Sequence, residues 1–145
     1  MEDLYVGIYD FASPEYDEAV SLRYAVLRKP LGLEFTAEQL AEEFADVHIG
    51  AWTSLGMVGT LTLSRYEENT IKMRQVAVSQ AEQSQGVGSA LVRFSEQWAL
   101  NEGYKTLVLH ARDTAVPFYI KLGYIPIGDA FVEVGIAHQK MSKTL

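Results

Sequence analysis

The sequence predicts an α/β protein, a mixed sheet flanked by helices, and three observations lead to this fold class. The 145 residues suit one domain, and 48% of them are hydrophobic, which is enough for a sizeable core. Runs rich in Val, Ile, Tyr and Thr alternate with segments of helical apolar spacing. An amphipathic helical segment also leads into Thr106–Arg112, an almost continuously apolar strand typical of a parallel β-α-β unit.

The first half of the chain is expected to begin with a strand and two helices. Leu4–Phe11 is rich in Tyr, Val and Ile and predicts the first strand. Ser13–Glu15 predicts a helix start, because it supplies a cap, a proline in the first turn and an acid. Apolar residues at helical spacing continue this helix to Leu27, and the sequence KPLG at 29–32 breaks it. Thr36–Gln39 can form a capping box for a second, short helix.

The remaining elements are predicted by apolar patterns and by the turn residues between them. Leu55-Gly56 suits a hairpin, and Gly103 and Gly123 each follow a helical pattern as the residue that ends it. We expect strands at 47–53, 57–65, 70–79, 106–112, 124–128 and 137–143, and helices at 89–102 and 115–122. The predicted order is therefore β-α-α-β-β-β-α-β-α-β-β.

Composition and charge exclude several classes of function. The chain has no cysteine, which excludes disulfides, thiolate metal sites and an acyl-cysteine intermediate. A net charge of −7 disfavours nucleic acid and anionic membranes. His48, His110 and His138 lack ligand spacing, so we expect no metal. Without a signal-peptide pattern or a membrane-length apolar stretch, we expect one soluble cytoplasmic domain over residues 1–145.

The stretch Met73–Gly88 joins a predicted strand to a predicted helix through glycines. Glycines allow close approach of the backbone to an anion, and the helix start offers free N–H groups and a partial positive charge. A P-loop is excluded because no Lys follows the glycines. A Rossmann fingerprint is excluded because Leu91 occupies its last position.

The glycine stretch resembles a known acyl-coenzyme A loop. Gln83, Gly86 and Gly88 fit the pattern Q-x-x-G-x-G, which is similar to the loop of the GNAT N-acetyltransferase superfamily. Ala115–Tyr124 also resembles the family's A-x-x-[FL]-Y-x-K-x-G-[FY] segment, and the order of elements resembles its fold over essentially the whole chain. The resemblance implies a sheet that splays between its fourth and fifth strands. It also implies direct transfer of an acetyl group from acetyl-CoA to a primary amine in a ternary complex.

The resemblance implies which residues bind acetyl-CoA. Backbone N–H groups from Gln83 to Ser89 would hold the pyrophosphate, and the strand before the loop would pair with the pantetheine arm. Gln83 stands where the family often has Arg, and Arg112 where many members have Asn. Arg112 could contact the pantetheine or a phosphate of the cofactor, or pair with Asp113 or another carboxylate. The implied cofactor-binding residues are Val76, Ala77, Val78, Gln83, Ser84, Gln85, Gly86, Val87, Gly88, Ser89, Arg112 and Phe118.

Tyr119 is the predicted general acid, because the family residue that it matches often protonates the departing thiolate. The general base, which must take a proton from a cationic amine, is left open among His138, Glu133, His110 and a chain of waters. His110 has a second interpretation, as a buried histidine satisfied inside the sheet.

The amine acceptor is expected between the first two helices and the last strands, lined by Tyr24, Arg28, Leu33 and Phe35. Arg28 or Arg23 could hold a substrate carboxylate. Solvated helix faces are expected to carry acidic residues, namely Glu38, Glu42 and Glu43.

Two other hypotheses stay open at this stage. The departures at Gln83 and Arg112 suit a non-catalytic module of the same fold that binds or senses acyl-CoA. An unrelated α/β interaction domain, in which the glycine loop is incidental, is the third reading. The sequence leaves open whether the amine is a small molecule or a peptide, the acyl chain length, and a homodimeric state.

Overall fold

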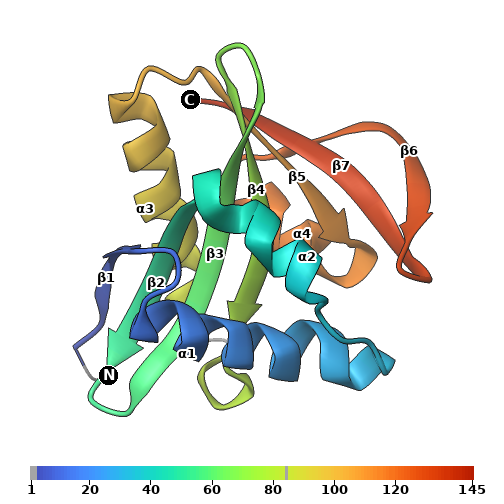
Figure 1. Ribbon diagram of the computed structural model, residues 1–145. Helices are drawn as coiled ribbons and strands as arrows, with labels where there is room; N and C mark the ends of the chain where they lie inside the picture. The colour runs from blue at the N-terminus through green and yellow to red at the C-terminus, as the bar shows by residue number, and fades with distance from the viewer. Residues whose placement is uncertain (1–2, 84) are drawn as a thin grey trace.

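The computed structural model describes residues 3–83 and 85–145, and these form a seven-stranded sheet with helices on both faces (Figure 1). The strands are β1 (Tyr5–Tyr9), β2 (Val47–Thr53), β3 (Gly56–Glu67), β4 (Thr70–Val78), β5 (Thr106–Arg112), β6 (Ile125–Glu133) and β7 (Ile136–Thr144). The helices are α1 (Pro14–Arg23), the π-helical turn η1 (Tyr24–Arg28), α2 (Ala37–Ala41), α3 (Val87–Asn101) and α4 (Val116–Lys121). Short 3₁₀ turns lie at Lys29–Leu31, Glu42–Ala45, Gln80–Glu82 and Asp113–Ala115. The predicted order of strands and helices is confirmed.

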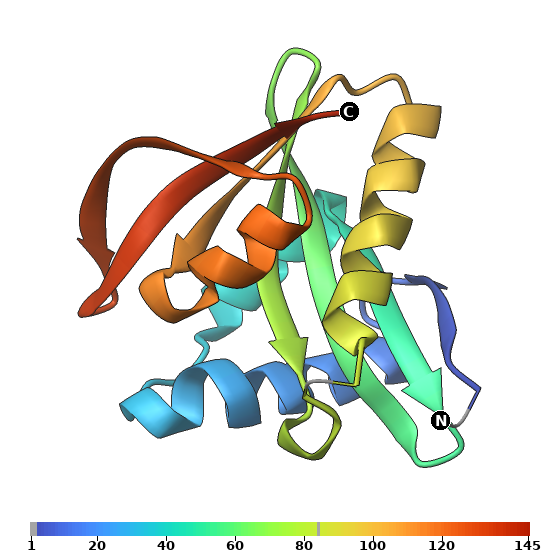
Figure 2. The ribbon, with the colours of Figure 1, turned by 180° about the vertical axis from the view of Figure 1, so that it is seen from behind.

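The strand order in the sheet is β1-β2-β3-β4-β5-β7-β6. Within the described part of the chain, β4 and β5 are the one parallel pair, and the other neighbours are antiparallel. α3 is the crossover between β4 and β5, as the predicted β-α-β unit requires. α1 and α2 cover one face of the sheet (Figure 1), and α3 and α4 cover the other (Figure 2).

The predicted helix starts are made by side-chain caps. The Ser13 hydroxyl accepts a hydrogen bond from the Tyr16 N–H at 3.1 Å. Thr36 and Gln39 form the reciprocal capping box, with bonds of 3.0 and 3.1 Å. These bonds satisfy N–H groups that have no partner inside the helix, so the local sequence is sufficient to place both starts.

Two element boundaries differ from the prediction by more than two residues. The α-helical pattern of α1 ends at Arg23, and η1 continues it as a π-helical turn in which the N–H of Lys29 donates to the Tyr24 carbonyl. Apolar spacing over so few residues does not separate the two kinds of helix. β6 runs to Glu133 instead of ending at Gly128, because Gly128, at φ +72°, forms an irregularity inside the strand.

The main core lies between the sheet and α3. Alternate residues of β5, Leu107, Leu109 and Ala111, are buried in it together with Leu91 of α3. Full burial of a Leu side chain contributes about 1.5–3 kcal/mol, so a few such contacts fix α3 on the sheet. A smaller cluster around Tyr16 lies beneath α1. The remaining β5 side chains face the α1 side, where the polar residues described below gather.

A buried ion pair joins α1 to the turn after α2, and it corrects one prediction. Glu43, expected on a solvated face, is buried and accepts two hydrogen bonds from the Arg23 guanidinium, at 2.8 and 2.6 Å, and one from the Tyr16 hydroxyl at 2.8 Å. Burial by itself raises the pKa of Glu43, but the hydrogen bonds and charge of Arg23 outweigh it and hold the pKa below its ordinary value. Arg23 is fully buried, so it is not free to hold a substrate carboxylate.

Candidate active site

β4 and β5 separate along their length, which confirms the predicted splay. Their pairing runs from Thr70 beside Thr106 to Met73 beside Leu109 and stops there. β4 continues to Val78 and β5 to Arg112. The last residues of both strands therefore lack each other as hydrogen-bonding partners, and an open strand edge can accept an extended ligand.

A β-bulge at Gln75 accompanies this separation. Gln75 has φ +56°, and the β3–β4 register shifts between Arg74 and Ala77. A bulge adds one residue, bends the strand and increases its twist. It also reverses the side-chain alternation: Met73 faces the α3 core before the bulge, and Val76 and Val78 pack on the same core after it.

The backbone of Val78 faces the open edge. The Ser79 N–H donates to the Val58 carbonyl of β3 at 2.8 Å. Because successive residues of a strand present their N–H groups to opposite edges, the N–H of Val78 points away from β3, toward the β5 side. By the same alternation the backbone of Ala77 points to β3. The Val78 carbonyl accepts a hydrogen bond from the Gln83 side chain at 3.1 Å, so Gln83 ties the loop before α3 to the end of β4.

The N-terminus of α3 starts directly after this edge. Gly86 precedes the helix at φ +83°, a left-handed conformation that favours glycine, and a Cβ there would have no atom within 4 Å. Its carbonyl accepts the bond from the Ala90 N–H at 3.0 Å. The N–H groups of the first helical residues, Val87, Gly88 and Ser89, have no acceptor inside the helix and carry the positive end of its dipole. Ser84, predicted to belong to this site, lies outside the described residues.

Three predicted cofactor residues come together around Gly88. A Cβ on Gly88 would lie 3.2 Å from the Phe118 ring of α4 and 3.8 Å from Val78 of β4. Gly88 therefore allows close packing of α3 against α4 and β4. The end of β4, the start of α3 and the Phe118 side chain form one junction, as the resemblance implies. Gln85 is exposed in the loop beside it.

Tyr119 lies on α4, next to Phe118. It is buried, and its ring contacts Phe118 and Tyr124 edge to face. No described residue makes a hydrogen bond to its hydroxyl, whereas the hydroxyl of Tyr124 donates to Glu96 at 2.7 Å. Burial raises the pKa of Tyr119 to about 12, so the phenol stays protonated at neutral pH.

The base candidates form a cluster on the α1 side of the sheet. Glu133 lies 3.3 Å from Nδ1 of His110 and 3.7 Å from Nε2 of His138. The other ring nitrogen of His138 lies 2.8 Å from the Ile136 carbonyl, which fixes that nitrogen as the donor. Burial and then the charge of Lys72, whose Nζ is 3.5 Å from the ring, lower the pKa of His110. The structure thus unites Glu133, His110 and His138, three separate candidates in the sequence.

The predicted acceptor residues lie around η1. Tyr24 and Phe35 line a hollow of about 400 Å³ between α1 and α2, and Arg28 lies over the Phe35 ring at 4.6 Å. Arg112 donates from Nη2 to the Leu27 carbonyl at 3.3 Å, which places it on the η1 side of the sheet. Whether it contacts the cofactor stays a prediction.

Two cationic residues of this face were missed by sequence reasoning. Lys72 and Arg74 alternate with the buried Ile71 and Met73 on β4, and therefore point to the α1 face. The signal was present in the sequence, because charged residues that alternate with apolar ones mark the opposite face of a strand. Among the described residues, no group of three His, Asp or Glu side chains could hold a metal ion, and no helix is long and apolar enough to cross a membrane.

Comparisons with known proteins agree with this geometry. A family profile described as "Acetyltransferase (GNAT) domain" matches residues 17–145. The uncharacterized N-acetyltransferase YjcF of Bacillus subtilis is 32% identical over 80 residues, which are 54% of this chain and 57% of that protein. The matched part thus spans little more than half of that relative's length.

Solved structures share the fold over nearly the whole chain. A provisionally assigned N-acetyltransferase from Lactobacillus plantarum has a TM-score of 0.85 at 23% identity, covering 98% of each chain. A GNAT family acetyltransferase from Elizabethkingia anophelis, solved with acetyl-CoA bound, has a TM-score of 0.76 at 18% identity and covers 100% of each chain. At identities this low, the similarity of the structures establishes a common fold and nothing more specific.

Proposed function

The chain belongs to the GNAT family of acetyltransferases, and we propose that it transfers an acetyl group from acetyl-CoA to a primary amine by direct attack. The observation that carries the proposal is the junction of the open β4 edge, the start of α3 and the Phe118 ring around Gly88. This junction offers N–H donors for an anion and a strand edge for a chain of amides. Both parts suit acetyl-CoA, and the absence of cysteine favours direct transfer over an acyl-enzyme.

The residues present fit the pyrophosphate of acetyl-CoA. The N–H groups of Val87, Gly88 and Ser89 would hold it at the start of α3, and the missing Cβ of Gly86 leaves room beside them. The side-chain amide of Gln83 already donates a hydrogen bond to the Val78 carbonyl. Backbone N–H groups would therefore supply most of the phosphate contacts. The N–H of Val78 would bind the pantetheine arm or the thioester oxygen as negative charge develops.

Tyr119 would stabilise the leaving group. The amine nitrogen forms a bond to the thioester carbon, the carbon–sulfur bond breaks, and the sulfur leaves as a thiolate that must be protonated. A pKa of about 12 lies far above the value of about 8.5 for a thiol. Complete transfer of the phenolic proton would therefore cost about 5 kcal/mol. The Tyr119 hydroxyl would act chiefly as a hydrogen-bond donor to the sulfur, and solvent would supply the proton.

The proton lost by the amine would pass to the cluster of Glu133, His110 and His138. Burial and Lys72 keep His110 neutral at pH 7, and Glu133 can accept a proton and share it with either imidazole. A chain of waters from the amine to this cluster is an equivalent route. A cytoplasmic location and a homodimer stay predictions.

Two isosteric substitutions at Gly86 test the cofactor site. Asn and Asp both tolerate a positive φ, and either side chain enters open space, so Gly86→Asn and Gly86→Asp differ mainly in charge. By calorimetric titration of acetyl-CoA, we expect Gly86→Asp to bind at least about fivefold more weakly than Gly86→Asn, since a charge about 4 Å from the pyrophosphate costs between ~1 and ~4 kcal/mol. Equal affinity of the two variants, or no binding by the wild type, would refute this site.

The second candidate function, binding of acyl-CoA without turnover, predicts the same titration result. Tyr119→Phe separates the two. In an enzyme it lowers the rate of thiol release, whereas in a sensor it leaves acetyl-CoA affinity unchanged and there is no acetylation to lose.

A further inference from the structure

The α1 side of the sheet carries a group of cations near the open end of β4 and β5. The strand register places their side chains on one face, opposite the α3 core: Lys72 lies beside Val108, His110 beside Lys140, and Arg112 beside His138. Arg74 follows Lys72 on the same face of β4, and Arg28 reaches it from η1. The group therefore comprises Arg28, Lys72, Arg74, Arg112 and Lys140.

None of these five cations has a carboxylate within 4 Å in the described part of the chain. The nearby acids are few: Glu43 is bonded to Arg23, Asp46 is within electrostatic reach of Arg74, and Glu133 faces His110 and His138. The whole chain has a net charge of −7, so this local excess of positive charge has the opposite sign to the charge of the protein as a whole. Such a concentration of like charge is unfavourable unless an anion compensates it.

The two lysines of the group already have partners. The Lys140 ammonium donates to the Tyr66 hydroxyl at 3.3 Å, and Lys72 and Lys140 both lie over the Tyr66 ring, at 5.7 and 5.1 Å. Lys72 also approaches His110. Both lysines are therefore gathered around Tyr66 of β3.

Arg28 and Arg112 are held in place, and all three arginines keep free donors. Arg28 stacks on Phe35, which leaves the edge of its guanidinium available. Arg112 gives one N–H to the Leu27 carbonyl, and four of the five N–H donors of a guanidinium remain. Arg74 is exposed. Burial first, and then the charges of Arg23, Arg112 and Arg74, lower the pKa of Arg28, which is consistent with close approach of the group.

We propose that the amine acceptor carries an anionic group, a carboxylate or a phosphate, which Arg28, Arg74 and Arg112 bind. The inference rests on the acetyl transfer proposed above and names the class of its acceptor. A guanidinium pairs with two oxygens of a carboxylate or phosphate at once, and such charged hydrogen bonds are about twice as strong as neutral ones. Binding of the anion here holds the amine of the same molecule beside Glu133, His110 and His138.

Matched pairs of amines test the proposal in a thiol-release assay with acetyl-CoA. The pairs are β-alanine with β-alaninamide, glutamate with its diamide, and phosphoethanolamine with ethanolamine. We expect the anionic member of at least one pair to have a kcat/KM about tenfold or more above its neutral partner, as charged hydrogen bonds predict. The carboxylate and phosphate pairs then distinguish the two sources of the anion.

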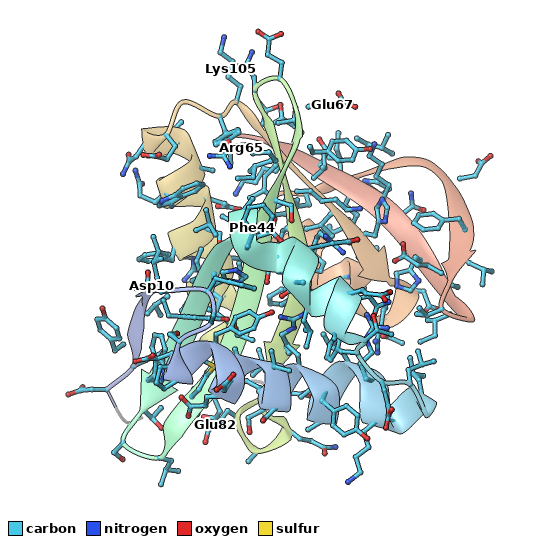
Figure 3. All side chains as sticks on the ribbon, in the orientation of Figure 1. Asp10, Phe44, Arg65, Glu67, Glu82 and Lys105 are labelled. Atoms are coloured by element: carbon cyan, nitrogen blue, oxygen red, sulfur yellow. The ribbon has the colours of Figure 1, made fainter. Side chains whose placement is uncertain are left out.

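Charge-neutral variants locate the binding residues. Arg28→Gln, Arg74→Gln and Arg112→Gln should each raise the KM for the anionic amine about tenfold and change the KM for acetyl-CoA less than about twofold. The matched control is Lys105→Gln, which removes the same charge at the end of the sheet opposite Glu82 and the loop before α3 (Figure 3). It should change neither constant.

Two outcomes refute the proposed acceptor class alone, and a third refutes the acetyl transfer on which it rests. If no anionic amine exceeds its neutral partner although acetyl-CoA binds, the acceptor class is wrong. If the arginine variants raise the KM for acetyl-CoA and leave that for the amine unchanged, the arginines bind cofactor phosphates. If wild-type protein does not bind acetyl-CoA, the proposed function itself is wrong, and this inference is refuted with it.

Discussion

Gly59 of β3 controls how closely α3 approaches the sheet, and Gly59→Ala tests this contact. A Cβ at Gly59 would lie 2.8 Å from both Leu91 Cδ1 and Val87 Cγ1. Carbon atoms prefer separations of about 3.5–4.0 Å, so α3 must move outward or both side chains must leave their preferred rotamers. Such overpacking costs about 1–3 kcal/mol, and the reduced freedom of the unfolded chain returns about 0.4–1 kcal/mol. We expect a net loss of about 1–2 kcal/mol.

Urea unfolding at equilibrium measures this loss, and a double-mutant cycle assigns it to the contact. Val87→Ala removes one of the two clashing atoms, so the combined variant should be more stable than the sum of the single effects by about 1 kcal/mol. Because Val87 starts α3, Gly59→Ala should also weaken acetyl-CoA binding. A stability change below about 0.5 kcal/mol, or strict additivity in the cycle, would refute the reasoning, since neighbours in contact are expected to couple.

Three further predictions concern the buried pair, the site and the pH dependence of stability. Arg23→Gln leaves Glu43 as a buried unpaired charge, and urea unfolding should show a loss of about 3–5 kcal/mol; a loss below about 1 kcal/mol would mean that the pair is dispensable. Tyr119→Phe should lower kcat about tenfold to a hundredfold with acetyl-CoA affinity unchanged by calorimetry, and an unchanged kcat would exclude its role at the leaving group. Burial lowers the pKa of His48 from 6.5, so the unfolded chain binds more protons and stability should fall as the pH drops below about 6.5. Unfolding at pH 7.5 and 5.5 should show a smaller difference in His48→Gln than in the wild type.

Much of the fold followed from local signals that act within a few residues. The caps at Ser13 and Thr36 and the glycine at Gly86 each determine backbone geometry directly, so their predicted places are confirmed. Gly128 misled the prediction because a positive φ is compatible both with a turn and with an irregularity inside a strand. The π-helical form of η1 was not predicted, because apolar spacing over five residues does not distinguish it from an α-helix.

The candidate site was predicted less completely, because it depends on strand register. The loop and its helix are contiguous in sequence, so the residues predicted to bind the cofactor there could be named together. Glu133, His110 and His138 come from three strands, and only the observed register brings them within 4 Å. Glu43 was misplaced because its partner Arg23 lies twenty residues away, and a carboxylate that looks solvated on its own helix turn is buried once that partner is folded against it.

The bulge at Gln75 shifts the side-chain alternation of β4 by one residue. Residues on either side of it belong to the same strand, yet the rule for which positions face the core changes at this one residue. Deleting Gln75 would restore strict alternation along β4 and leave Val76 and Val78 on the core face, because they would then stand two and four positions after Met73. If β4 instead kept every residue but paired with β3 without the bulge, Val76 and Val78 would point to the opposite face. Comparison of β4 with a regular strand therefore requires a one-residue gap between Arg74 and Val76.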